Sequence, residues 1–143
     1  MKTIPYALLI LFVFSSCDDN INVDTIDRFL GTWELKNVLI DGDAISTPPS
    51  KITIIFSGKV KNLVFSGQST CNFYGGDVIN VTTKKDILFS AIYSTEMACS
   101  PDFLNIFEND YYKWLTKANQ YSIEDNKLIL SFEKTYLNFE KVN

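Results

Sequence analysis

Residues 51–65 read Lys-Ile-Thr-Ile-Ile-Phe-Ser-Gly-Lys-Val-Lys-Asn-Leu-Val-Phe, and this stretch indicates a β-hairpin. The first part, Lys51–Phe56, is rich in β-branched residues, which favour strands. Ser57-Gly58-Lys59 then supplies the small and polar residues of a hairpin turn, and Val60–Phe65 is the returning strand. The stretch therefore predicts two antiparallel strands joined by a tight turn.

Further strand candidates lie on both sides of this hairpin. Upstream, Gly31–Ile40 alternates with period two and places Trp33, Leu35 and Leu39 on one face. The downstream candidates are Ser69–Tyr74, which Gly75-Gly76 ends, and then Asp77–Thr82, Ile87–Ile92, Gln120–Ile123, Lys127–Glu133 and Thr135–Lys141. Short strands at this spacing predict a mostly antiparallel sheet, as a curved meander or partial barrel.

Residues 101–117 predict one amphipathic helix, which makes the fold class α+β. Ser100 suits the N-cap and Pro101 the first helical position. An apolar stripe at helical spacing predicts packing on the sheet, with a ligand surface as the alternative. The stripe consists of Phe103, Phe107, Tyr111, Trp114, Leu115 and Ala118. Glu108 is expected on the solvent side.

The composition excludes several functions. The chain of 143 residues has 13 basic and 17 acidic side chains and no histidine. Without histidine there is no Ser-His-Asp or Cys-His catalysis and no imidazole metal ligand. The acidic balance argues against a nucleic-acid partner, which needs a basic face. Hydrophobic residues make up 46% of the chain, as expected for one folded domain.

The N-terminus has the order of a secretory signal. Lys2 gives a basic start, Ile4–Phe14 is an apolar run of eleven residues, and Ser15-Ser16 is a small-residue exit. A membrane-spanning helix needs about 20 apolar residues, so a retained anchor is the weaker alternative. We expect residues 1–16 to be a signal peptide.

Cys17 follows this exit directly. The stretch Phe14-Ser15-Ser16-Cys17 resembles a bacterial lipobox, with Phe14 where leucine is usual. An ordinary signal with an incidental cysteine is the alternative. Lipidation of Cys17 would make the membrane a partner, because acyl chains hold a protein on a bilayer. The expected location is then the cell envelope, on the periplasmic face of either membrane or on the cell surface. Residues 17–27 are interpreted as a polar tether and residues 28–143 as the domain.

Two motifs give the chain a family resemblance. Residues 66–76 resemble the G-x-x-G-C-N-x-F-x-G motif of the META domain family, with Thr70 where glycine is usual, and residues 94–99 resemble its T-x-M-A-C motif. The matching residues are Gly67, Cys71, Asn72, Phe73, Gly75, Thr95, Met97, Ala98 and Cys99. The resemblance covers about residues 28–141 and implies a compact α+β fold. Since the family includes a heat-inducible envelope lipoprotein of enteric bacteria, it also implies a stress-related role. It implies no reaction.

A lipocalin-like carrier of a small apolar ligand is the alternative function. Gly31-Thr32-Trp33 near the start of a β-rich secreted domain also occurs in lipocalin-like proteins. In those proteins the main helix follows eight strands, whereas strands are expected after the helix here. The two motifs have no lipocalin counterpart.

Cys71 and Cys99 have three possible roles. In an oxidising compartment an even pair is most simply a disulfide, and buried thiols or a redox pair are the alternatives. We expect the two to lie close together, with Cys71 on a strand and Cys99 in the link before the helix. A loop of about 28 residues closed by a disulfide would gain about 3 kcal/mol.

The other motif residues are interpreted as structural. Asn72 is expected to bind loop backbone, with a substrate contact as the sharper alternative. Thr95 and Met97 are interpreted as loop packing, and Gly67, Gly75 and Gly76 as turn residues. Asp102, Glu108 and Asp110 match no calcium loop. We therefore expect no catalytic residue, no metal site, no cofactor and no enzymatic activity.

Overall fold

The computed structural model describes residues 23–142, so the predicted signal peptide, Cys17 and residues 17–22 of the predicted tether lie outside it. In chain order its helices and strands are α1 (Val23–Phe29), β1 (Gly31–Ile40), β2 (Asp43–Ile45), β3 (Thr53–Lys59), β4 (Asn62–Gln68), β5 (Phe73–Val81), β6 (Ile87–Phe89), β7 (Tyr93–Ser94), α2 (Phe103–Lys117), β8 (Gln120–Glu124), β9 (Lys127–Phe132) and β10 (Thr135–Lys141). Within this range no helix is long and apolar enough to cross a membrane.

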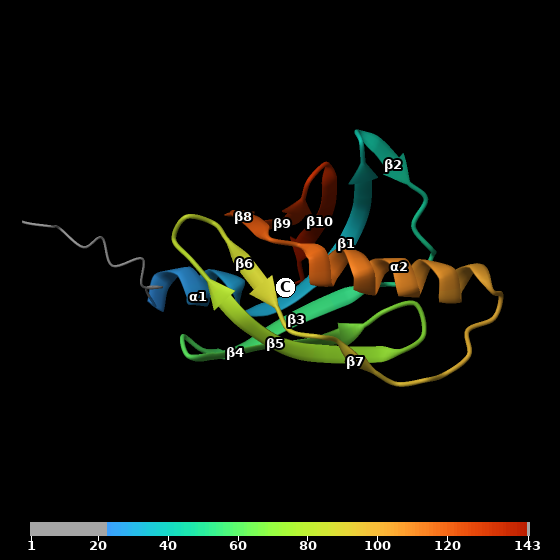
Figure 1. The fold of residues 1–143 in the computed structure, drawn as a ribbon, viewed down its shortest axis with the longest axis horizontal. Helices are drawn as coiled ribbons and strands as arrows, with labels where there is room; N and C mark the ends of the chain where they lie inside the picture. The colour runs from blue at the N-terminus through green and yellow to red at the C-terminus, as the bar shows by residue number, and fades with distance from the viewer. Residues whose placement is uncertain (1–22, 143) are drawn as a thin grey trace, which may run out of the picture.

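The strands form one antiparallel sheet that curls into a nearly closed barrel. The order is β6-β5-β4-β3-β1-β10-β9-β8, while β2 pairs with β1 and β7 pairs with β5. The two ends of the sheet meet through backbone hydrogen bonds, from Ile87 to the carbonyl of Asn119 (3.1 Å) and from Tyr121 to that of Lys85 (2.8 Å). Figure 1 shows α2 lying across the curled sheet. The α+β class and the partial barrel are confirmed.

Aromatic and aliphatic side chains from α1 and from the inner face of the sheet fill the barrel. Phe29 packs edge-on against Phe56 with ring centroids 5.2 Å apart, and Phe65 packs against Phe89 at 5.1 Å. From α2, Tyr111 and Leu115 are fully buried against this core. Burial of several such side chains, each contributing roughly 1.5–3 kcal/mol, is the main force that holds helix and sheet together.

The predicted hairpin is present as β3 and β4, but its turn lies two residues later. Strand pairing continues to Lys59 opposite Asn62, so Val60 and Lys61 form the turn. In β1 a β-bulge lies between Leu35 and Asn37. Because a bulge reverses the alternation of faces, Val38 is fully buried there instead of the predicted Leu39.

The region around the first motif differs from the sequence prediction. The expected strand 69–74 is a loop over 69–72, and β5 runs through Gly75 and Gly76 without a break. The glycines are needed for close packing rather than for turns. A Cβ on Gly75 would lie 2.7 Å from the Tyr93 hydroxyl, and one on Gly67 would collide with the Thr53 carbonyl. Of the predicted strand 87–92 only residues 87–89 are a strand, β6, and the short strand β7 follows outside the predicted range.

The predicted helix is present as α2, with three differences. It begins at Phe103 behind Asp102, so Ser100 is not its N-cap and Pro101 lies before its first turn. Phe103 is 53% exposed and does not belong to the core, whereas Phe107 is buried. Glu108, expected on the solvent side, is buried at 5% exposure. Because a buried charge needs hydrogen-bond partners, its surroundings define the candidate site.

The described part of the predicted tether contains a helix. In α1, Ile26 is 2% exposed and Phe29 is fully buried, so the residues that pack on the barrel begin before the predicted boundary at residue 28. Arg28 donates a hydrogen bond to the carbonyl of Ile123 and so connects α1 to β8. Asp24, in the first turn, stabilises this helix because its negative charge lies near the positive, N-terminal end of the helix dipole.

Candidate functional site

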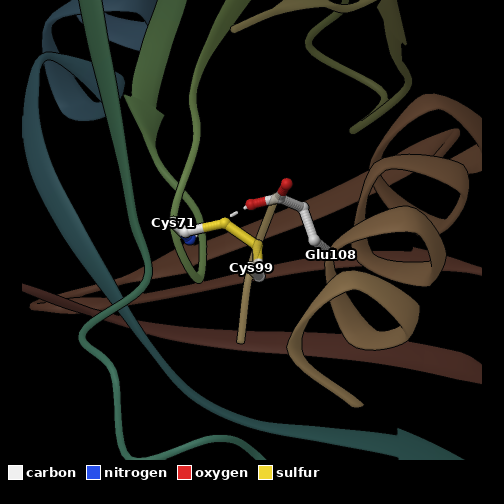
Figure 2. Close-up of side chains that lie close together, drawn as sticks. All are labelled: Cys71, Cys99 and Glu108. Carbon is white, nitrogen blue, oxygen red and sulfur yellow. Dashed lines mark hydrogen bonds between the residues drawn. A yellow bond between two sulfur atoms is a disulfide. The ribbon is translucent and has the colours of Figure 1, made fainter. Parts of the chain in front are cut away.

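Three segments that are distant in sequence meet at one junction. These are the loop 69–72 between β4 and β5, the link 95–99 after β7, and the second turn of α2. Figure 2 shows Cys71, Cys99 and Glu108 converging there, with the two sulfur atoms bonded. Both family motifs contribute to the junction, so the structure brings them together.

A disulfide joins Cys71 to Cys99 across this junction. Their Cα atoms are 6.0 Å apart, within the usual range for a disulfide, although 28 positions separate them in sequence. Cys71 lies in the loop rather than on the expected strand, and Cys99 is buried before α2. The bond therefore fixes the start of α2 to the end of β4.

Glu108 is the centre of the hydrogen bonds around the disulfide. Its Oε2 accepts from the backbone N–H of Cys71 (3.2 Å), the backbone N–H of Asn72 (3.1 Å) and the Thr70 hydroxyl (3.2 Å). Its Oε1 accepts from the Asn72 side-chain amide at 2.5 Å. Four donors thus hold a carboxylate that is almost out of contact with water.

The pKa of Glu108 follows from this balance. Burial alone raises the pKa, but hydrogen bonds from the side chain and backbone of Asn72 and from the backbone of Cys71 hold it below its ordinary value. The carboxylate is therefore charged at neutral pH. Burial and this neighbouring negative charge raise the pKa of Tyr112, one turn later on α2, to about 12.

Asn72 connects Glu108 to the second motif. Its Oδ1 accepts from the Thr95 hydroxyl (2.7 Å) and from the backbone N–H of Met97 (2.8 Å), while its Nδ2 also donates to the Met97 carbonyl (3.0 Å). The side chain is 4% exposed, so these bonds replace its bonds to water. Asn72 thus binds loop backbone, as the sequence predicts.

The remaining motif residues surround this pair. Thr95 receives a hydrogen bond from the backbone N–H of Phe73 (3.2 Å), and its own backbone N–H donates to the Phe73 carbonyl (3.0 Å). Met97 takes part through its backbone and leaves its side chain exposed, and the Phe73 ring is likewise exposed. Ala98 is an exposed link residue before Cys99.

The junction also contains three residues of types that can bind a metal ion, namely Cys71, Cys99 and Glu108. Their ligand atoms lie within 4.8 Å of one another. In the oxidised protein each sulfur is bonded to the other, and thiolates are what a metal would require. The Glu108 oxygens already accept four hydrogen bonds. The arrangement therefore serves as structural support and does not fit a metal ion.

Glu108 is the residue that sequence reasoning missed. A carboxylate on an amphipathic helix is ordinarily assigned to the solvent side. Its spacing carried a signal, because Leu104, Glu108, Tyr111 and Leu115 recur at intervals of four, three and four, which places them on one helix face. Asp102 is exposed and Asp110 is paired with Lys113, so neither joins the junction.

The fold and the junction define a class: a small, disulfide-linked β-barrel domain with one helix packed across it. The chain belongs to the META domain family, since the sequence model of that family matches residues 27–142. This confirms the resemblance carried by the two motifs. No curated protein matches the chain.

Three solved structures have a similar fold. A protein from Burkholderia xenovorans, solved by NMR, is 21% identical, with a TM-score of 0.70 over 100% of this chain and 99% of its own. A DUF4847 family protein from Bacteroides vulgatus, solved by crystallography, is 18% identical, with a TM-score of 0.56 over 81% and 96%. A further NMR structure is 20% identical, with a TM-score of 0.59 over 85% and 95%. At these identities the similarity concerns the fold alone.

Proposed function

We propose that this META-family protein is a lipoprotein of the bacterial cell envelope that acts by binding and catalyses no reaction. The observation that carries the anchoring is Phe14-Ser15-Ser16-Cys17 after an apolar run of eleven residues. Acyl chains on Cys17 would hold the protein durably, at about 0.8 kcal/mol per buried methylene.

The position of α1 is consistent with this anchoring. The helix begins six positions after Cys17 and packs on the barrel through Ile26 and Phe29. A lipidated Cys17 would therefore keep the barrel close to the bilayer surface. In a bacterium with two membranes this is the periplasmic face of either membrane or the cell surface.

The junction supports the non-catalytic part of the proposal. A catalytic site needs a nucleophile or a general base whose reactive atom is free to contact a substrate. At the junction both sulfur atoms are in the disulfide, and Glu108 and Asn72 direct their polar atoms at loop backbone and at each other. Chain-internal contacts thus account for the motif side chains that carry chemistry.

Mass spectrometry of the membrane fraction tests the anchoring. The full-length gene is expressed in its native host or a close relative, and the N-terminal peptide is identified. We expect a mature N-terminus at Cys17 with a mass increase equal to its acyl groups. An unmodified Cys17, or a mature N-terminus elsewhere, would refute the anchoring.

A matched pair of variants separates anchoring from the other cysteines. Cys17→Ser should release the protein from membranes or leave it unprocessed. The double variant Cys71→Ser, Cys99→Ser keeps Cys17 and should stay in the membrane fraction. Release of both variants would mean that folding, and not lipid, governs membrane association.

The stress-related role is proposed on the family resemblance. Its test is the amount of protein before and after heat shock, together with the survival of a strain that lacks the gene. A heat-induced increase with reduced survival of the deletion strain supports the role. Unchanged amount and unchanged survival would remove it from the proposal.

A further inference from the structure

A groove lies beside α2, and its lining does not include the junction residues Cys71, Asn72, Cys99 and Glu108. It has a volume of about 630 Å³, which is within the range of small-molecule sites. One wall is the helix and the other is the end of β1 with the segment after β2. The helical wall includes Phe103, Ile106, Asp110 and Trp114.

The helical wall is apolar although much of it faces water. Phe103 is 53% exposed and Ile106 is 63% exposed, and they lie three positions apart on one face of α2. Beneath them the rings of Phe107 and Trp114 pack edge-on with centroids 5.8 Å apart. Exposed apolar groups clustered in a concavity are typical of binding surfaces. Phe103 in particular is a residue of the predicted core stripe that the core does not use.

The opposite wall combines apolar side chains with the hydroxyl groups of Ser46 and Thr47. Pro48 and Pro49 have no backbone N–H, and their rings fix the local backbone. Ile45 adds an aliphatic side chain from β2. A ligand in this groove would therefore be held mainly by apolar contact along its length.

Asp110 is the one charged residue among the lining residues of the groove. Its Oδ1 lies 3.1 Å from the Lys113 ammonium, with side chains 42% and 66% exposed. Exposed pairs of this kind contribute only about 0–1 kcal/mol. A ligand cation beside Asp110 can therefore share or replace Lys113 at little cost, whereas an anion would find no cationic side chain among the lining residues.

We propose that this groove binds a small amphiphile with an aromatic or aliphatic body and a cationic amine. The body would lie along Phe103, Ile106 and Trp114, and the ammonium would pair with Asp110. This binding does not depend on lipid at Cys17, so the two proposals fail independently.

Three probes with one body and different head groups test the proposal. They are 4-phenylbutylamine, 4-phenylbutanol and 4-phenylbutyrate, titrated into the full processed protein labelled at isoleucine methyl groups. We expect the amine to shift the NMR signals of Ile45 and Ile106 saturably, with a Kd about three- to fivefold below that of the carboxylate. The signals of Ile79, which is equally exposed on β5, should not move.

Surface variants complete the test. Asp110→Asn should reduce the preference for the amine over the alcohol to about onefold. Ile106→Ser should weaken all three probes, whereas the control Ile79→Ser should not. Equal affinity for amine and carboxylate, shifts spread over Ile79, or unchanged affinity in Asp110→Asn would overturn the proposal. Circular dichroism of each variant shows that a loss of binding is not a loss of fold.

Discussion

The side-chain amide of Asn72 donates a 2.5 Å hydrogen bond to the Glu108 carboxylate, 36 positions later in the chain. Asn72 lies in the loop between β4 and β5, and Glu108 lies in α2. Through its other atoms Asn72 also holds the backbone of Met97. One amide thereby joins both sequence motifs of the family to the helix.

Asn72→Ala should lower the free energy of unfolding by about 2–3 kcal/mol. The reason is that the substitution removes one of the four donors to the buried Glu108 carboxylate, together with the side-chain partners of the Met97 N–H and carbonyl. Urea unfolding followed by circular dichroism measures the change. The control is Asn138→Ala, which removes an exposed amide pair with Asn37 and should cost less than about 1 kcal/mol. Equal effects of both substitutions would contradict the role given to Asn72.

The stability conferred by Glu108 should depend on pH. Its pKa is lowered in the folded protein, so unfolding takes up a proton in the range between the folded and unfolded values. Stability is then fully present above the unfolded pKa of about 4.3 and is lost as pH falls through the folded pKa. Unfolding of the wild type and of Glu108→Gln is compared from about pH 7 to pH 3. Their difference should shrink toward acid pH, and a constant difference would refute the prediction.

Removal of the disulfide should destabilise the domain without unfolding it. The double variant Cys71→Ser, Cys99→Ser should lose about 2–5 kcal/mol, since its unfolded chain is no longer cross-linked. The hydrogen bonds of Asn72 and Glu108 stay in place, so the folded structure should persist. Thermal unfolding gives the loss, and the backbone NMR spectrum shows the fold. An unchanged thermal midpoint would mean that the bond adds nothing to stability.

Much of the architecture could be predicted from local pattern. The hairpin over residues 51–65, the helix near 101–117 and the proximity of Cys71 and Cys99 followed from turn residues, periodicity and motifs. The buried Glu108 could not be predicted in this way, because its donors come from a loop 36 positions away. Val38 replaces Leu39 in the core for a similar reason, since a bulge depends on the pairing with β10.

Two phenylalanines on α2 should differ in their contribution to stability, because Phe107 is buried and Phe103 is exposed. Phe107→Ala should cost about 3–5 kcal/mol, because the ring is buried between helix and sheet. Phe103→Ala, one turn earlier and 53% exposed, should change stability by less than about 1 kcal/mol. Urea unfolding of the two variants provides the comparison. A large loss in Phe103→Ala would return that residue to the core stripe that the sequence predicts.

If the family motifs build a structural junction through Asn72 and Glu108, a double-mutant cycle should show that these two side chains are coupled. The free energy of unfolding is measured for the wild type, Asn72→Ala, Glu108→Ala and the double variant at neutral pH. We expect a coupling energy of about 1–3 kcal/mol, because the two side chains share a buried hydrogen bond. Losses that add within about 0.5 kcal/mol would show that the two residues act independently and would contradict the claim.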